Sequence, residues 1–366
     1  MNVIGIIAEY NPFHNGHVYL LEKIKEMYPD SLIILVLNGL FLQRGEFSIL
    51  TKEDKTKIAL DHNIDIVLEL PTFYGTQSAD IFAEAALHIL NKFKVETIIF
   101  GSEANNPNIL KEIATIQLND QNYQTNVKTY LKQGFNYPTS LAKALNLDFN
   151  FLPNDLLGIS YAKAILKNNY PINVETIKRT NDYKDTTSNN GIISATNIRN
   201  KLKNNEDITP FLPKNITNFI NINEDKYLTI LKYKILTHPN LNQFLDVDEG
   251  LEHLLKKEIK TSQNLDEFIK KIKSKRYTYN KLNRLFIHIL LELNKNINLQ
   301  IDYIHILGFN KKGQEYLNSL KENLNLNINK NSYLYHFELQ TSLIYDLINQ
   351  TNTYNFELKN KPIIKN

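Results

Sequence analysis

The sequence predicts an α/β protein with a doubly wound parallel sheet, a helical insertion and a mainly α-helical C-terminal domain. Three observations lead to this prediction. Over the first 200 residues, short apolar runs alternate with helical patterns, as a parallel sheet requires. A stretch of about 70 residues within this region contains only helical runs. Beyond residue 200 the alternation stops and helical patterns dominate.

The expected strands are apolar runs with the length of a buried strand in a parallel sheet. They are residues 3–7, 31–37, 65–70, 96–100 and 174–178. Helical patterns lie between them at 15–28, at 52–62 after a Thr51 cap, and at 79–92, which is rich in alanine.

The long excursion between the fourth and fifth strands, at 104–172, is too large for a loop without structure of its own. Periodic apolar residues within it predict helices at 108–118, 121–133, 139–146 and 155–168. We therefore expect a helical insertion in the first domain.

The chain length implies two domains, because 366 residues exceed the roughly 250 to 300 at which a single core stops growing. A polar stretch followed by Thr209-Pro210-Phe211-Leu212-Pro213 places the boundary between 1–205 and 206–366. The clearest later helices are expected at 251–260, 265–272 and 279–293. In 302–366 the pattern leaves open whether 306–309 and 333–338 are strands or helix ends.

The composition excludes several classes of protein. Lys and Arg number 42 against 39 Asp and Glu, so the net charge of +3 implies no general affinity for nucleic acid. The absence of cysteine excludes disulfides, thiolate metal sites and a cysteine nucleophile. No run reaches the roughly 18 apolar residues of a membrane span, and no signal-peptide pattern is present. We expect a soluble, cytoplasmic protein without a membrane partner, and nothing implies a protein partner.

The loop after the first strand, Glu9-Tyr10-Asn11-Pro12-Phe13-His14-Asn15-Gly16-His17, predicts a nucleotide site. It joins a strand to a helix, and the unpaired N–H groups and dipole at a helix N-terminus favour a phosphate. His14 and His17 lie on one side of the first turn and are expected to be neutral hydrogen-bond donors at neutral pH. They could instead bind zinc or lie on the surface. Zinc needs a third ligand, which no cysteine or suitably placed histidine provides, so we expect no protein-bound metal.

Polar residues also follow the other strands, where ligands bind to an open parallel sheet. Asn38-Gly39 and Gln43-Arg44-Gly45-Glu46 follow the second strand, Gly101-Ser102-Glu103 the fourth, and 179–183 the fifth. Each could be an ordinary turn. Their common position at one edge of the sheet favours a binding site, and we expect Ser102 to contribute to it.

A second motif, Ile193-Ser194-Ala195-Thr196-Asn197-Ile198-Arg199, suits the same site. Ser194 and Thr196 can cap the helix that follows and help to hold β- and γ-phosphates, while Arg199 offers a planar, multi-donor charge for a pyrophosphate leaving group. Alone, the motif could be a plain cap with a solvent-facing arginine. Together with the histidine loop, it favours a phosphate site.

One basic run is a candidate surface for nucleic acid. Between residues 268 and 284 there are seven basic side chains and no acidic ones, with Tyr277 and Tyr279 interleaved. Basic groups can neutralise phosphates and tyrosines can stack on unpaired bases, although a charge run is usually a solvated helix face. The expected RNA-binding residues are Lys270, Lys271, Lys273, Lys275, Arg276, Tyr277, Lys281 and Arg284.

These motifs resemble a known family. His14-Asn15-Gly16-His17 is similar to the H-x-G-H signature of the nucleotidyltransferase superfamily, which activates a substrate on the α-phosphate of a nucleoside triphosphate, and 193–199 is similar to its I-S-x-T-x-I-R element. Over most of its length the chain resembles bacterial tRNA(Met) cytidine acetate ligases. The motifs are 8–17, 43–46, 100–103, Pro153-Asn154-Asp155-Leu156-Leu157-Gly158, 193–199, Lys275-Arg276-Tyr277-Thr278 and 307–313. The chain departs from the family at Phe47-Ser48, where Pro-Ala is expected.

The resemblance implies a two-step reaction. Acetate attacks the α-phosphate of ATP to give acetyl-adenylate and pyrophosphate, and the wobble cytidine of elongator tRNA(Met) then takes the acetyl group to become N4-acetylcytidine. The implied ATP contacts are Gly101, Asn154, Arg179 and, in the first loop, Ile7, Ala8, Glu9, Tyr10, Asn11, Pro12, Phe13, Asn15 and Gly16. His14, His17 and Arg199 would stabilise the spreading charge, with Mg²⁺ held mainly by the phosphates. Residues 1–205 would be the catalytic, nucleotidyltransferase-like Rossmann domain and 206–366 the RNA-binding domain.

Two other functions stay open at this point. One is a small-molecule nucleotidyltransferase that joins an adenylyl or cytidylyl group to a phosphorylated alcohol, although such enzymes are often much shorter. The other is a catalytically silent protein that binds nucleotide or RNA for regulation. Intact His14, His17, Ser194, Thr196 and Arg199 argue against the latter.

Overall fold

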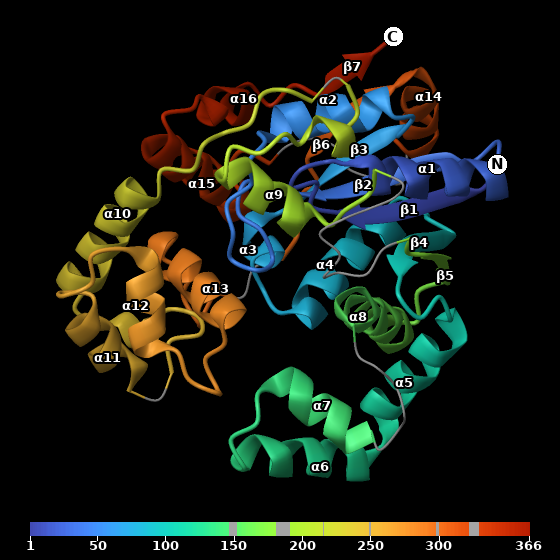
Figure 1. Cartoon of the computed structure of the whole chain (residues 1–366). Coiled ribbons are helices and arrows are strands. Elements are labelled where there is room, and N and C mark those ends of the chain that lie inside the picture. The colour runs from blue at the N-terminus through green and yellow to red at the C-terminus, as the bar shows by residue number, and fades with distance from the viewer. Residues whose placement is uncertain (146–151, 181–190, 215, 249, 298–299, 322–328) are drawn as a thin grey trace.

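The centre of the protein is a seven-stranded mixed sheet with the order β5-β4-β1-β2-β3-β6-β7 (Figure 1). The structure is a computed structural model that describes residues 1–145, 152–180, 191–214, 216–248, 250–297, 300–321 and 329–366. The strands are β1 (Val3–Ala8), β2 (Leu32–Asn38), β3 (Ile66–Leu70), β4 (Thr97–Ser102), β5 (Asn173–Lys178), β6 (Ile306–Asn310) and β7 (Ile363–Lys365).

All five strands predicted in the first 200 residues are confirmed, and β5, β4, β1, β2 and β3 pair in parallel. From β1 the chain builds outward to β2 and β3, then returns to the other side of β1 to form β4 and β5. Strand order therefore reverses between β1 and β4. A crevice at the carboxyl ends of these two strands is the expected binding position in such a sheet.

The two remaining strands come from the C-terminal part of the chain. β6 pairs antiparallel with β3, with Val67 opposite Gly308, and β7 pairs parallel with β6. The segment 306–309, which the sequence left ambiguous, is thus a strand, whereas 333–338 begins a helix. A boundary near residue 205 therefore does not separate all of the sheet from the later helices.

Helices cover both faces of the sheet, as expected for a doubly wound fold (Figure 1). Ile4 and Ile33 point to the face covered by α1 and α2, whereas Val3 and Ile34 point to the face covered by α4, α8 and α14. Successive side chains of a strand alternate between faces, and both faces are apolar here. The helices are α1 (Asn15–Met27), α2 (Lys52–Asp61), α3 (Thr72–Gly75), α4 (Ala79–Lys92), α8 (Pro153–Asn168) and α14 (Lys311–Leu320).

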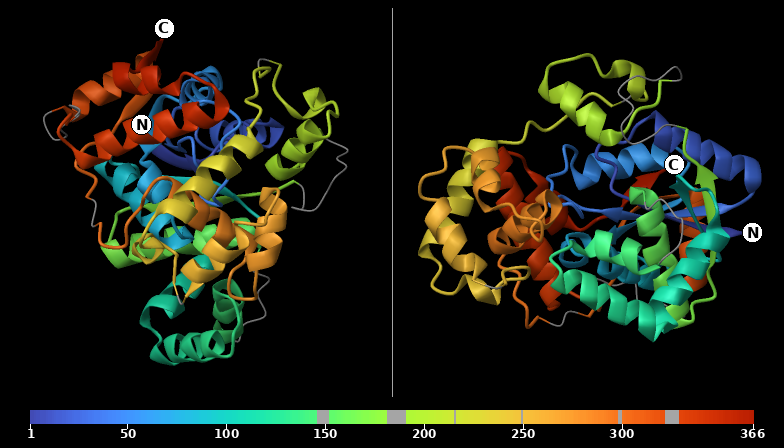
Figure 2. Two further views of the ribbon diagram at one scale, coloured as in Figure 1. Left: turned by 90° about the vertical axis from the view of Figure 1, so that its left-hand side faces the viewer. Right: turned by 60° about the horizontal axis from the view of Figure 1, so that its bottom comes forward.

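The predicted helical insertion is present and projects from the sheet domain (Figure 2), but it is shorter than the predicted 104–172, because α8 packs on α4 and covers the sheet. It consists of α5 (Pro107–Asn119), α6 (Gln121–Lys132) and α7 (Tyr137–Leu145). Leu110, Ile113 and Tyr123 form a small core of their own with Ile159 of α8. The insertion is thus anchored on the helix that covers the sheet.

A second large core lies among the later helices, where Leu231, Phe268, Phe286 and Tyr345 are buried. It also takes in Phe41 and Phe47 from the loop after β2, so this loop connects the sheet to the helical part. The remaining elements are α9 (Ala195–Lys203), α10 (Glu224–Thr237), α11 (Leu251–Glu258), α12 (Leu265–Ile272), α13 (Tyr279–Leu290), α15 (Tyr333–Asn349), α16 (Thr353–Lys359) and 3-10 turns at Thr209–Phe211 and Leu241–Gln243.

Within the described ranges, none of the helices combines the length and the apolar character needed to cross a bilayer.

Candidate functional site

A cavity of about 1000 Å³ opens at the carboxyl edge of the sheet. Its walls come from the loop after β1, the start of α1, the ends of β4 and β5, α9, the insertion and α13. Its volume lies at the upper end of the roughly 300–1000 Å³ typical of small-molecule sites. The cavity therefore has room for a nucleotide together with part of a second reactant.

The loop 9–17 is fixed by buried polar contacts rather than by regular structure. The Glu9 carboxylate accepts hydrogen bonds from the side chain of Asn38 at 3.0 Å and from the backbone of Gln43 at 2.8 Å. The buried ammonium of Lys55 donates to the carbonyls of Glu9, Asn38 and Gly39. These contacts tie the ends of β1 and β2 together and pre-form one wall of the cavity.

His14 and His17 form a reciprocal cap at the start of α1. Nδ1 of His14 accepts the backbone N–H of Gly16 at 3.0 Å, and Nδ1 of His17 accepts the backbone N–H of His14 at 3.1 Å. A backbone N–H can only donate, so both Nδ1 atoms must be unprotonated and each neutral ring carries its proton on Nε2. Both residues line the cavity, and each can offer one N–H donor to a ligand.

The two imidazoles are held in the neutral form. Burial, followed by the charges of Arg179 and Arg199, lowers the pKa of His14 to about 3. Burial, His14 and Arg179 lower the pKa of His17 well below its usual value. The prediction of neutral donors is thus confirmed in direction, but burial rather than the helix dipole is the largest cause.

Gly16 is required by the position of the His14 ring. A Cβ on Gly16 would lie 2.7 Å from Cε1 and 2.9 Å from Nδ1 of His14, which is too close for any other residue. The glycine of the H-x-G-H motif therefore lets the first histidine fold back over the helix start.

Arg199 closes the cavity from the side of α9. Its Nη1 donates to the Asn11 carbonyl at 2.7 Å and its Nη2 donates to the Glu46 carboxylate at 2.6 Å. Ser194 caps α9 as predicted, by accepting the N–H of Asn197 at 3.2 Å. Thr196 lies in the first turn, with its hydroxyl 3.5 Å from Arg199, and does not cap the helix.

The loop that carries Glu46 rests directly on α13. Gly45 has φ +74°, and a Cβ there would lie 2.2 Å from the backbone carbon of Asn283 and 2.3 Å from the backbone nitrogen of Arg284. Only glycine permits both this conformation and this approach. The loop that holds Glu46 next to Arg199 therefore packs on α13, the helix that carries Lys281 and Arg284.

Glu103 organises the opposite wall. Its carboxylate accepts a hydrogen bond from the Asn154 side chain at 2.5 Å and lies 3.7 Å from Nε of Arg179. Ser102 donates to Asp155 at 2.5 Å and is fully buried, so it supports this wall and does not reach the cavity. Asn154 and Arg179 do line the cavity.

Most of the predicted nucleotide residues meet at this one cavity, but some do not. It is lined by Ile7, Ala8, Glu9, Tyr10, Asn11, His14, Gly16, His17, Gly101, Asn154, Arg179, Ser194, Thr196 and Arg199. Pro12, Phe13, Asn15 and Ser102 are not among the lining residues. Phe13 is in the core under α1, and Asn15 donates to the carbonyls of Gly191 and Pro210 at 3.0 Å each. Of the segment 179–183, residues 181–183 lie outside the described part of the chain.

The basic run divides into an exposed part and a part that reaches the cavity. Lys270, Lys271, Lys273 and Lys275 are exposed, and Lys271 pairs with Glu267 at 2.7 Å. Arg276, Lys281 and Arg284 line the cavity. Tyr277 is only 8% exposed and donates its hydroxyl to the Asp248 carbonyl, so its ring is not available for stacking on a base. Tyr279 is exposed instead, with the Lys273 ammonium 4.4 Å from its ring centre.

Positive charge is concentrated around the cavity. Of the described residues that line it, seven are basic and three are acidic, although the whole chain is only +3. Each acidic group has polar partners: Glu9 binds Asn38, Glu46 binds Arg199, and Asp80 binds Ser160 and Lys163. The electrostatics favour a polyanionic ligand.

The sequence did not reveal the apolar wall that the insertion contributes. Leu131, Phe135, Tyr137 and Leu141 of α6, α7 and their connection line the cavity, as do Gln117 and Asn136. Three are unusually exposed for their type, with Tyr137 at 49%, Leu131 at 40% and Phe135 at 36%. Their presence at the site depends on how the insertion is placed, which no local pattern in the chain encodes.

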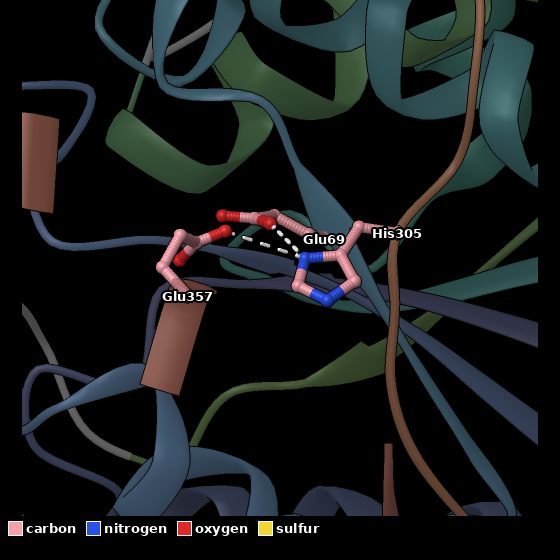
Figure 3. A group of neighbouring side chains, drawn as sticks. All are labelled: Glu69, His305 and Glu357. Atoms are coloured by element: carbon pink, nitrogen blue, oxygen red, sulfur yellow. Dashed lines mark hydrogen bonds and ion pairs between the residues drawn. The ribbon is translucent and has the colours of Figure 1, made fainter. Parts of the chain in front are cut away.

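A second cluster of ionisable groups lies away from the cavity, at the junction of the sheet with the C-terminal helices. Glu69, His305 and Glu357 offer ligand atoms within 4.8 Å of one another (Figure 3). Their composition would suit a metal ion. However, the buried ammonium of Lys52 contacts Glu69, Glu338 at 3.0 Å and Glu357 at 2.8 Å.

Protonation of His305 completes this cluster. Burial alone would lower the pKa of His305, but its hydrogen bonds to Glu357 and Glu69 raise it to about 9. Its Nδ1–H then donates to Glu69 at 2.6 Å. Two positive charges from side chains thus occupy the place of a metal ion, and the cluster ties β3, α2, α15 and α16 together.

The chain matches the family model described as HIGH nucleotidyl transferase over residues 1–362. Among curated proteins it is 38% identical to a tRNA(Met) cytidine acetate ligase of Fusobacterium nucleatum, over 90% of this chain and 87% of the relative. It is 37% identical to a tRNA(Met) cytidine acetate ligase of Geobacillus sp., over the full length of both chains.

Solved structures are also similar to this chain over its whole length. Thermotoga maritima TmcAL without ligand superposes with a TM-score of 0.85 and 28% identity, over 100% of this chain and 99% of the other. The same protein bound with alpha-thio ATP gives a TM-score of 0.84 and 27% identity over the same shares. The similarity thus covers the sheet, the insertion and the C-terminal helices together.

Proposed function

The chain belongs to the tRNA(Met) cytidine acetate ligase family of the HIGH nucleotidyl transferases, and on this premise we propose that it activates acetate with ATP and acetylates tRNA. The product is N4-acetylcytidine at the wobble position of elongator tRNA(Met). The observation that supports this most is the single cavity in which the His14–His17 pair and Arg276, Lys281 and Arg284 meet. Because tRNA is the proposed substrate, the proposed place of action is the cytoplasm.

In the proposed first step, an oxygen of acetate attacks the α-phosphorus of ATP and pyrophosphate leaves. The protein contributes position and charge, because this transfer needs little covalent chemistry from side chains. The Nε2–H groups of His14 and His17, at the positive end of the α1 dipole, are the proposed donors to the α-phosphate. Arg199 and Arg179, on opposite walls, are the proposed partners of the leaving pyrophosphate.

Mg²⁺ is proposed to accompany ATP and to be held mainly by its phosphates, where it would neutralise charge. Glu9, Glu46 and Asp80 are the acidic residues among the described lining of the cavity, and each is engaged with protein partners. This arrangement supports binding through phosphates and not through a dedicated set of protein ligands.

In the proposed second step, the exocyclic amine of cytidine attacks the carbonyl carbon of acetyl-adenylate. The bond from this carbon to the phosphate oxygen breaks, AMP leaves, and the amine loses one proton. The mixed anhydride is already activated, so no covalent protein intermediate is needed. His14 and His17 are neutral and donate through Nε2, so we assign neither as a general base.

The direct test combines purified protein, ATP, labelled acetate and bulk tRNA. We expect acetate-dependent release of pyrophosphate and label in tRNA, recovered as N4-acetylcytidine after digestion to nucleosides. ATP turnover that depends on a phosphorylated alcohol would favour the small-molecule nucleotidyltransferase. Nucleotide or RNA binding without turnover would favour a regulatory binding protein.

A further inference from the structure

The wall of the cavity formed by the insertion carries none of the groups proposed above to bind phosphate. We define this insertion wall as Leu131, Phe135, Tyr137 and Leu141. The groups proposed to bind phosphate lie on the other walls, at the start of α1, on α9 and directly after β5. Large exposed apolar side chains that gather at one place on a soluble protein usually mark a binding surface. The ligand of this wall should therefore be a flat or apolar group and not a phosphate.

Two aromatic side chains make up the centre of the insertion wall. The Phe135 ring is supported by Tyr130, at a centroid distance of 6.1 Å, and by the Lys143 ammonium at 4.9 Å. Tyr137 begins α7 and is the most exposed residue of the wall. A tyrosine held at a helix start presents a ring with few rotatable bonds, which suits stacking on a planar ligand.

The positive charge on the other side of the cavity indicates which kind of molecule carries this planar group. Arg276, Lys281 and Arg284 line the cavity near α13, and the exposed lysines 270, 273 and 275 continue the basic surface outside it. A strand of RNA satisfies both surfaces, because its phosphates pair with basic groups while unpaired bases stack on aromatic rings.

Geometry also requires that the acceptor base leave its own stack. The amine must reach the acetyl group beside His14 and His17 inside the cavity, and a base that is paired and stacked within a helix does not present its amine in this way. Enzymes that modify a base turn it into a pocket and hold it between aromatic or apolar side chains. Among the described aromatic residues that line the cavity, Tyr137 and Phe135 of the insertion wall are the most exposed.

We infer that Tyr137, which lines the cavity together with Phe135, stacks on the extruded cytosine and positions its amine for acetyl transfer. This inference rests on the proposed function. It makes Tyr137 a residue for acceptor binding, outside the machinery that forms acetyl-adenylate.

The test separates base stacking from acetate activation. Tyr137→Leu keeps an apolar side chain but removes the aromatic face, and Tyr137→Phe restores it. We expect Tyr137→Leu to raise the KM for tRNA about tenfold, the order of one lost base–aromatic stack. Acetate-dependent ATP–pyrophosphate exchange should stay at the wild-type rate, and Tyr137→Phe should restore the KM. The matched control is Tyr233→Leu, which removes a 64% exposed tyrosine of α10 outside the cavity lining.

A binding assay makes the outcome independent of turnover. An anticodon stem-loop with pyrrolocytosine at the target position cannot be acetylated, and its fluorescence falls when the base stacks. We expect quenching with wild type, Tyr137→Phe and Tyr233→Leu, and little quenching with Tyr137→Leu. Tyr137→Met serves as a second variant if Tyr137→Leu does not fold, with the same expectation.

Unchanged quenching and an unchanged KM in the Leu and Met variants would overturn the stacking role and leave the proposed function intact. Loss of pyrophosphate exchange in these variants would also overturn it, because Tyr137 would then belong to the activation of acetate. Failure of the wild-type protein to acetylate any tRNA would instead overturn the proposed function.

Discussion

The ring of His17 accepts the backbone N–H of His14, and the ring of His14 accepts the backbone N–H of Gly16 two residues further on. Each histidine thereby replaces the Ser, Asp or Glu that usually caps a helix. The cap fixes both tautomers, and the two Nε2–H groups remain for a ligand. One local arrangement thus provides the N-terminal cap of α1 and two hydrogen-bond donors for a phosphate.

The first prediction separates these two tasks. His14→Asn keeps a good N-cap residue but removes the Nε2–H donor. We expect acetate-dependent ATP–pyrophosphate exchange to fall about 100-fold or more, as when one donor to a developing charge is lost. The melting temperature should stay close to that of wild type.

The matched variant is His14→Ala, which removes donor and cap together. It should lose the same activity and in addition about 1 kcal/mol of stability. If His14→Asn exchanges pyrophosphate at the wild-type rate, His14 acts only as a cap and its assignment to the phosphate is wrong.

The second prediction concerns the contact between α13 and the loop after β2 that carries Gly45 and Glu46. Gly45→Ala should be strongly destabilising, because its Cβ would lie 2.2 Å from the backbone of Asn283. Gly250→Ala is the control, since Gly250 has a similar φ of +78° and nothing within 4 Å of an added Cβ. The free energy of unfolding of the control should fall by about 1–2 kcal/mol from backbone strain alone. That of Gly45→Ala should fall by about 1–3 kcal/mol more, because the new Cβ overlaps the α13 backbone, and urea unfolding measures both values. Equal losses would show that the loop does not rest on the helix.

The third prediction is a dependence of stability on pH that His305 causes. Its pKa is about 6.5 in an unfolded chain and about 9 in the fold. The protonated form is favoured in the native state, so this stabilisation is complete below about pH 6.5 and is lost as the pH rises through about 9. His305→Gln keeps an N–H donor but removes the titration.

The free energy of unfolding of both proteins is measured across this pH range. The advantage of wild type over His305→Gln should shrink steadily as the pH rises. A constant difference would mean that His305 is neutral in the fold, and a metal ion or another arrangement would then have to balance Glu69 and Glu357.

The fourth prediction tests the exposed half of the basic run. Lys270→Glu with Lys275→Glu should weaken tRNA binding and lower the slope of log Kd against log salt by about two, one for each lost phosphate contact. ATP affinity should not change. Arg276 is left intact because it lines the cavity. Lys359→Glu with Lys361→Glu makes the same change in charge at the exposed C-terminal end. If this control weakens binding equally, the effect is one of net charge and not of this surface.

Much of the fold was predictable because its elements carry strong local signals. The apolar runs of β1 to β5 and the periodic patterns of α1, α4 and the insertion helices lie within a few residues of the predicted bounds. β6 was ambiguous because Ile306, Leu307 and Phe309 fit either a short strand or a helix end. Its place beside β3 depends on pairing across more than 200 residues, which no local pattern contains.

The candidate site was predictable where motifs follow strands, and less so elsewhere. Ser102 and Asn15 stand next to cavity residues in the sequence but make supporting contacts to Asp155 and to backbone carbonyls. Lys52 is typical of an exposed helix position by type, yet it is buried among three carboxylates. The presence of Tyr137 in the same cavity as Arg276 and Arg284 depends on packing between distant helices.

In the proposed reaction, acetate becomes acetyl-adenylate in this cavity before its acetyl group passes to cytidine. The most direct test uses acetate labelled with oxygen-18, ATP and tRNA in a single reaction. One acetate oxygen should appear in AMP, in amounts equal to N4-acetylcytidine, because that oxygen bridges carbon and phosphorus in the intermediate and leaves with phosphorus. Heavy oxygen in inorganic phosphate together with ADP, or AMP without heavy oxygen, would rule out an acetyl-adenylate intermediate.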